Sequence, residues 1–145
     1  MKYFTIEELS ASQTANKKGI DNTPTEEHKI NLKALVDNVL DKTREWYGQP
    51  IIVTSGYRNN KLNNSIGGVK KSQHNNGQAA DIVAKNMKDN AKLFQYIKNN
   101  LQYDQLIWEK GNDTNPSWIH VSYTNKINRK QVLKTKDGKN YSIYT

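Results

Sequence analysis

The sequence predicts a single α+β domain in which helices pack on a small, mostly antiparallel sheet. The helix patterns come mainly first along the chain, and short β-branched runs mix in later. The length of 145 residues suits one domain with one modest hydrophobic core. No internal repeat and no change of composition marks a boundary. We therefore expect residues 1–145 to form one domain.

The N-terminal third carries two helix starts. In "FTIEEL", Thr5 is the expected N-cap and Glu8 completes a capping box. In "TPTEE", Thr23 is the expected N-cap, and apolar residues then recur at helical spacing as far as Gly48. This pattern predicts a helix of about six turns. His28 lies outside the apolar series and is expected on the surface, and the polar stretch between the two helices is expected to be a surface connection.

Two strand patterns flank a long polar segment. "PIIVTSGYR" predicts a buried strand that leaves into a loop, and "QAADIVA" predicts a second strand. The segment between them is rich in Asn, Ser and Gly, which favours a long ordered loop that can contain one helical turn.

The second half predicts one helix and two pairs of strands. "NMKDNAKLFQYIKNNL" predicts a helix with Phe94, Ile97 and Leu101 on its inner face. "YDQLIWE" and "SWIHVSY" predict strands joined by the turn-forming "KGNDTNP", and "TKDGKNYSIY" predicts a small terminal hairpin.

Composition excludes several kinds of site. The chain has no cysteine, so disulfides, thiolate zinc sites and cysteine nucleophiles are excluded, and a metal site must use histidine and carboxylates. No apolar run is long enough to span a membrane. The first residues show no secretory signal, so the location stays open, and a protein acting on the cell wall would need lysis or another route of delivery.

The net charge of +8 attracts polyanions, and much of the excess lies in the basic C-terminal extension, residues 124–145. The simplest interpretation is a solvated basic face. Specific binding of nucleic acid would predict strong salt-dependent affinity without zinc, but no recognised motif accompanies the charge. We expect a monomer with no specific nucleic-acid partner.

Two histidines and an aspartate form a candidate metal site. His120 alternates with Ile119 and Val121, so it faces away from these apolar neighbours in a strand. Asp81 lies in an apolar stretch and needs a partner, because a bare buried carboxylate is costly. Together with His74 they suit a catalytic zinc with an open fourth position. A strand histidine is also common as a hydrogen-bonded core or surface residue, so spacing alone leaves both interpretations open.

Three stretches carry a family resemblance. "SGYR" (55–58), "SQHNNGQAADI" (72–82) and "WIHVS" (118–122) resemble the blocks of D-Ala-D-Ala carboxypeptidase-like zinc peptidases, which share their fold with the N-terminal signalling domain of hedgehog proteins. The resemblance spans roughly residues 3–123. It implies a zinc-dependent peptidase that hydrolyses amide bonds in peptidoglycan stem peptides. Relatives include carboxypeptidases and endopeptidases, and a wall hydrolase of the endolysin type fits the small, basic chain best.

The resemblance also implies roles for particular residues. Arg58 would bind a substrate carboxylate or stabilise the oxyanion of the tetrahedral intermediate. Ser72 and Gln73 would bind substrate or orient the neighbouring histidine, and structural hydrogen bonding is an equal alternative. The implied zinc ligands are His74, Asp81 and His120.

The general base is where the sequence departs from the family. Many relatives carry Glu or Asp three positions before the last histidine, where this chain has Ser117. Glu109 is the nearest substitute, because pairing of the two strands would place it across from the region of Trp118. Asp113 is the second candidate, and a solvated strand-end charge is the alternative for Glu109. The serine also favours a second hypothesis, a catalytically inactive zinc-containing module that binds the cell wall or a protein.

Overall fold

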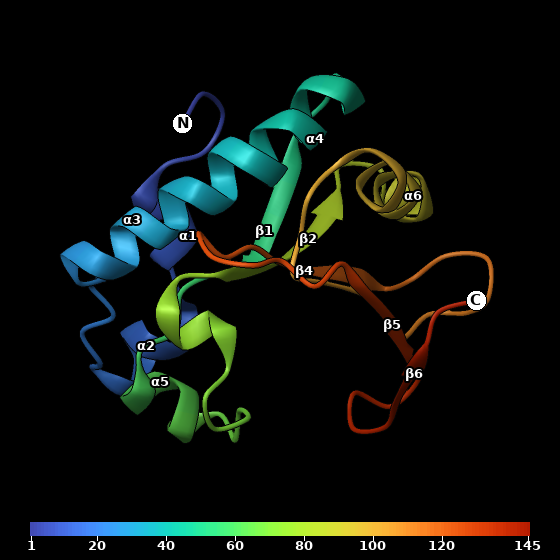
Figure 1. Cartoon of the computed structure of the whole chain (residues 1–145). Coiled ribbons are helices and arrows are strands. Elements are labelled where there is room, and N and C mark those ends of the chain that lie inside the picture. Colours follow the sequence, from blue (N-terminus) through green and yellow to red (C-terminus); the bar gives the residue numbers. More distant parts are fainter.

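A six-stranded sheet with the strand order β1-β2-β4-β3-β5-β6 runs through the computed structural model, which describes residues 1–145 (Figure 1). Neighbouring strands are antiparallel except for β3 and β5, which are parallel. The predicted α+β fold with a mostly antiparallel sheet is therefore confirmed. The strands are β1 (Ile51–Ser55), β2 (Ala79–Ala84), β3 (Gln105–Glu109), β4 (Trp118–Ser122), β5 (Gln131–Thr135) and β6 (Tyr141–Ile143).

The helices precede β1, join the first strands and follow β2 (Figure 1). A π-helical turn, Val36–Leu40, joins α3 to α4 in one continuous helix. This helix ends at Gly48, as the sequence predicts. None of the helices has the length and apolar character needed to cross a membrane. The α-helices are α1 (Ile6–Ser10), α2 (Gln13–Lys18), α3 (Glu26–Leu35), α4 (Asp41–Tyr47), α5 (Asn60–Ser65) and α6 (Asn90–Asn100), and the 3₁₀ turns are Gln73–Asn76 and Met87–Asp89.

One of the two predicted N-caps is correct. Thr5 caps α1, since its side chain accepts a hydrogen bond from the backbone N–H of Glu8. Thr23 is wrong as the cap of α3, because both its N–H and its hydroxyl donate to the Asp21 carboxylate. That local turn holds Thr23 outside the helix, and Thr25 two residues later accepts from the N–H of His28 instead.

Two segments predicted to be loops contain short helices. The polar connection before α3 includes α2, which Ser12 caps and which buries Ala15. The long segment between β1 and β2 includes α5, which Asn59 caps and which buries Leu62. In each case a capping side chain and one buried apolar residue fix a short helix, although the composition around them is that of a loop.

The hydrophobic core lies between the sheet and the helices. α6 contributes the predicted inner face, since Phe94, Ile97 and Leu101 are all buried. The prediction that β1 is a buried strand is wrong, because β1 pairs with β2 alone and Ile52 faces solvent. Trp46 lies outside the core as well and stacks on Tyr96, with the ring centroids 4.4 Å apart.

The basic C-terminal extension is part of the sheet. β5 pairs with β3 and β6 pairs with β5, which confirms the terminal hairpin and joins it to the predicted β3–β4 hairpin. Tyr144 then packs against the rings of Phe94 and Trp108. The segment that follows β4 is therefore held by backbone pairing and by core contacts.

Candidate active site

The pairing of β2 with β4 brings two of the predicted ligands together. Asp81 lies directly opposite His120, and the Nδ1 atom of His120 is 3.0 Å from the Oδ1 atom of Asp81. His74 arrives from the 3₁₀ turn before β2, and its Nε2 atom is 3.5 Å from the same oxygen. The three predicted residues thus converge, with ligand atoms that all lie within 4.8 Å of one another.

The backbone fixes the orientation of His74. Its Nδ1 atom lies 2.7 Å from the carbonyl oxygen of Gly56 and donates to it, so the lone pair is on Nε2. Gly56 is required for this approach, because a Cβ atom there would lie 2.1 Å from the carbonyl oxygen of Leu9. Burial lowers the pKa of His74, which favours the neutral imidazole that binds metal ions.

Asp81 is ionised in this setting. Burial acts to raise its pKa, but this effect is opposed first by the hydrogen bond from His120, and the pKa lies well below the ordinary value of a carboxyl group. Two imidazoles and a carboxylate are a donor set that zinc takes in catalytic sites. Tetrahedral zinc with bonds of about 2.0–2.1 Å separates its ligand atoms by about 3.3 Å. The spacings of 3.0 and 3.5 Å around the Asp81 oxygen fit that geometry.

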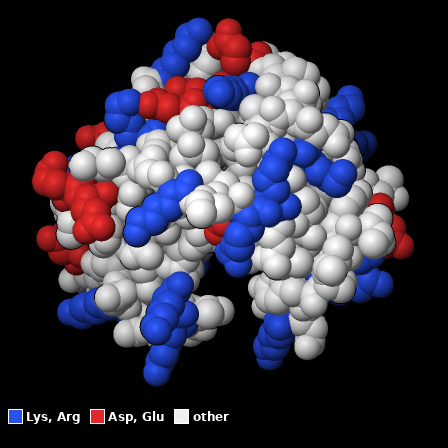
Figure 2. Space-filling view, in the orientation of Figure 1, with Lys and Arg blue, Asp and Glu red and all other residues white.

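These residues lie in a cleft of about 590 Å³ on one face of the sheet. Figure 2 shows a hollow that opens at the bottom of the view, with Lys and Arg side chains on both of its sides. Besides His74, Asp81 and His120, the cleft is lined by Arg58, Val69, Lys71, Ser72, Gln73, Gln105, Ile107, Glu109, Lys110, Trp118, Arg129, Leu133, Asp137, Gly138, Lys139 and Tyr141.

Glu109 lies in this cleft, at the end of β3. It pairs with Trp118, two residues after Ile107 pairs with His120, so Glu109 and His120 face the same side of the sheet. The side chain is only 7% exposed, so the interpretation of Glu109 as a solvated charge is wrong. Burial, with a smaller contribution from the Asp81 charge, raises the pKa of Glu109 to about 7.

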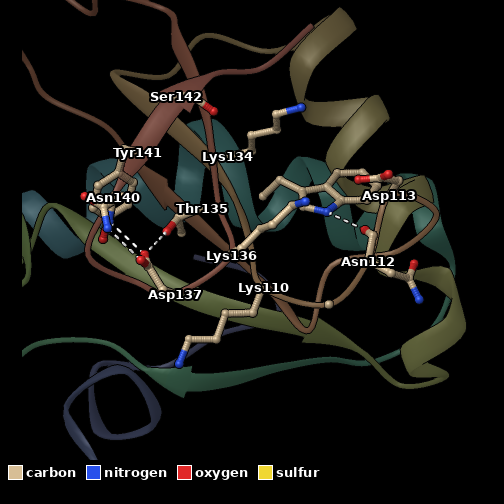
Figure 3. A pocket seen from close by; sticks show the side chains of 12 residues that line it. Lys110, Asn112, Asp113, Lys134, Thr135, Lys136, Asp137, Asn140, Tyr141 and Ser142 are labelled. Atoms are coloured by element: carbon tan, nitrogen blue, oxygen red, sulfur yellow. Dashed lines mark hydrogen bonds between the residues drawn. The ribbon is translucent and has the colours of Figure 1, made fainter.

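Asp113, the second candidate base, does not line the cleft. It lines a separate cavity beside Trp108, where it lies far from Tyr141 in the close view of Figure 3. Ser117 does not line the cleft either, and its N–H donates to the backbone oxygen of Glu109. Of the acidic candidates that the sequence offered, the structure brings Glu109 to the histidines.

Arg58 lines the same cleft from the segment after β1. One guanidinium nitrogen donates to the Ser55 hydroxyl at 3.3 Å, whereas the buried Nε atom has no partner in the protein. Burial lowers the pKa of Arg58 and the charge of Asp81 opposes that shift, but a guanidinium stays charged at neutral pH. The structure therefore places a cation with an unused hydrogen-bond donor beside the His-Asp-His group.

Ser72 and Gln73 both line the cleft and both make structural hydrogen bonds. The Ser72 hydroxyl accepts from the N–H of His74 at 3.2 Å. Gln73 donates to the buried carboxylate of Asp104 at 3.0 Å. Arg129 donates to the same carboxylate through its backbone N–H and its guanidinium, at 2.7–3.0 Å. This network ties the turn that carries His74 to the C-terminal segment.

The sequence did not identify Asp104 or Arg129, and no local pattern distinguishes them from other charged residues. His28, predicted on the surface, is instead half-buried, and its Nδ1 atom is 3.0 Å from the Tyr57 hydroxyl. The basic residues of the extension do not form one solvated face. Lys139 lines the cleft, whereas Lys134 and Lys136 line the separate cavity.

Comparison with known proteins agrees with this geometry. Comparison with curated proteins gives no match. The model of the family described as Peptidase M15 matches residues 2–122, which include the His-Asp-His group, Arg58 and Glu109. The match covers most of the chain and confirms the resemblance to D-Ala-D-Ala carboxypeptidase-like peptidases. The chain therefore belongs to the peptidase M15 family, a family of metallopeptidases.

Proposed function

We propose that this protein is a zinc-dependent peptidase that hydrolyses amide bonds in the stem peptides of peptidoglycan. The observation that carries the proposal is the convergence of a His-Asp-His group, a buried glutamate and an arginine in one cleft. Each of these is a part that amide hydrolysis needs: a metal site, a proton acceptor and a group that pairs with negative charge. Membership of a metallopeptidase family supports the same reaction.

His74, Asp81 and His120 would hold the zinc ion. Bound zinc polarises a carbonyl group and lowers the pKa of a coordinated water towards ~7. The hydrogen bond from His74 to the Gly56 carbonyl orients that imidazole before any ion arrives. The Asp81 carboxylate, kept ionised by the hydrogen bond from His120, would supply the anionic ligand.

Glu109 is the proposed general base. With a pKa of about 7, Glu109 is substantially ionised at neutral pH and can accept a proton. The same pKa lets the protonated carboxyl group act as an acid in the next step. The carboxylate would accept the proton of the attacking water and later give it to the leaving amine. Ile107, two residues before Glu109 on β3, and Trp118, opposite it on β4, line the cleft beside this carboxylate and limit its contact with bulk water.

Arg58 is the proposed partner of negative charge on the substrate. Its unpaired Nε–H and its planar guanidinium can donate to a substrate carboxylate or to the oxygen of the tetrahedral intermediate. The donor hydrogen bond to Ser55 and the backbone bond to His74 hold the segment in place before substrate binds.

The test is incubation of zinc-loaded protein with purified peptidoglycan, followed by mass analysis of the released fragments. We expect cleavage of stem-peptide amide bonds and a loss of about two to four orders of magnitude in turnover for Glu109→Gln, with zinc and folding retained. Asp113→Asn is the matched control and should stay near the parent, because Asp113 lines another cavity. If Glu109→Gln were fully active, Glu109 would not be the general base and another group would have that role.

A parent protein that holds zinc, binds wall fragments and cleaves none would favour the alternative function, a zinc-containing binding module. The absence of an acid at Ser117 is the feature that motivates this alternative. A protein that cleaves wall peptides would act at the bacterial cell wall, and we propose that it reaches the wall by lysis or by a separate export route.

A further inference from the structure

The C-terminal hairpin, residues 131–143, forms one side of the cleft although it lies beyond the family match at residues 2–122. The register aligns one residue from each of four neighbouring strands in a row. Residues directly opposite one another on paired strands face the same side of the sheet, so Tyr141 faces the side on which Glu109 lies. The row, from β4 to β6, is Trp118, Glu109, Thr135 and Tyr141.

The turn of this hairpin is an ordered structure. The Asp137 carboxylate accepts hydrogen bonds from the backbone N–H groups of Lys139 and Asn140, both at 2.8 Å, and from the Asn140 side chain at 2.7 Å. Figure 3 shows the bonds from Asn140 to the Asp137 carboxylate and a further bond to it from the Thr135 hydroxyl, at 3.3 Å. Tyr141 donates to the carbonyl oxygen of Gly138 at 3.2 Å. The backbone that carries Lys139 is therefore fixed before a ligand binds.

Two lysines line this end of the cleft. Lys110 and Lys139 both line it, and neither belongs to an ion pair. The Lys110 ammonium lies 5.3 Å from the centre of the Trp118 ring and also against Gly138, next to Lys139 in the turn. Lys110 directly follows β3 and has a φ of 56°, a left-handed conformation that begins the turn after the strand.

We propose that Lys110 and Lys139, with Tyr141 as the adjacent wall, form a second anion subsite that binds a carboxylate of the peptide substrate. Arg58 follows β1 at the opposite end of the strand order, so the subsite is distinct from the one proposed for Arg58. From β4, which carries the proposed metal ligand His120, to the turn between β5 and β6 are two to three strand spacings, about 10–14 Å. An extended peptide covers about 3.3 Å per residue, so the bound carboxylate lies about three to four residues from the scissile amide.

This inference rests on the proposed function, and paired substrates test it. In each pair, the two peptides share the scissile amide and differ only in a carboxylate or a carboxamide three or four residues away. One pair is made for each of these two distances on each side of the amide. For one pair we expect kcat/KM to favour the acid by about five- to tenfold, through KM. Lys139→Ala should abolish this preference. Lys136→Ala is the matched control, because Lys136 belongs to the same hairpin but lines the other cavity, and it should keep the preference.

Calorimetry of the same peptides with zinc-loaded Glu109→Gln measures the subsite without turnover. Acid peptides should bind about five- to tenfold more tightly than their amides, and adding Lys139→Ala should remove the difference. Equal kcat/KM and equal affinity for acid and amide would overturn the subsite and leave the proposed function standing. Absence of cleavage together with acid-selective, Lys139-dependent binding would overturn the proposed reaction and support the subsite.

Discussion

The buried carboxyl group of Glu109 should make the stability of the metal-free protein depend on pH, and Glu109→Gln should remove that dependence. The folded protein holds the Glu109 proton up to a pKa of about 7, whereas the ordinary value is 4.5. Between these values the folded state binds more protons than the unfolded state, so the free energy of unfolding falls as pH rises from about 4.5 through 7. Well below pH 4.5, where the effect is fully present, the difference between the two pKa values corresponds to about 3 kcal/mol.

Urea unfolding of metal-free parent and Glu109→Gln at pH 5 and pH 8 measures this effect. The stability of the variant relative to the parent should rise by about 2.5 kcal/mol between the two pH values. In thermal unfolding the same change corresponds to about 5–10 °C, at the few degrees per kcal/mol typical of a chain of this length. The comparison of two proteins cancels the titration of groups that they share.

A relative stability that does not change with pH would refute the reasoning. It would mean that Glu109 is ionised in the folded protein at its ordinary pKa, so that burial does not tune it for proton transfer near neutral pH. Asp113→Asn serves as the control, since Asp113 is exposed and the same comparison should show no change with pH.

Two further predictions concern the metal ligands and Arg58. Elemental analysis should find one zinc ion in the parent and a loss of zinc in His74→Ala and His120→Ala, because each removes a ligand; undiminished zinc in both variants would contradict the assignment. Arg58→Lys should weaken catalysis with zinc content and thermal stability nearly unchanged, since lysine keeps the charge but lacks the planar fork. A collapse of stability with normal activity per folded molecule would instead assign Arg58 to the structure of its loop.

The features that the sequence predicted correctly depend on local patterns. Phe94, Ile97 and Leu101 recur at helical spacing and do form the buried face of α6. The pairing of "YDQLIWE" with "SWIHVSY" needs only a turn between neighbouring strands, and that pairing carries Glu109 to its place opposite Trp118. The family resemblance pointed to the three residues that converge in the candidate metal site.

What the sequence missed depends on contacts between distant segments. Gln105 pairs with Gln131 through the parallel strands β3 and β5, and parallel pairing leaves no turn signature in the sequence. The bonds of Asp104 to Gln73 and Arg129 follow from that arrangement, so neither partner could be named in advance. The prediction of Thr23 as N-cap failed for a local reason, since its bonds to Asp21 hold it outside the helix and Thr25 caps the helix instead.

The parallel pairing of β5 with β3 also determines which strand forms the exposed edge on this side of the sheet. Without residues 123–145, β3 would be the last strand on its side, with a row of unpaired backbone N–H and C=O groups. Its side chains include the buried Leu106 and Trp108, so this would be a long apolar edge of the kind on which other chains add strands and aggregate. β5 covers that edge, and the edge left outermost is the short β6, whose residues are all exposed. The hairpin thus replaces the exposed edge of β3 by the edge of a shorter strand, quite apart from any ligand that it binds.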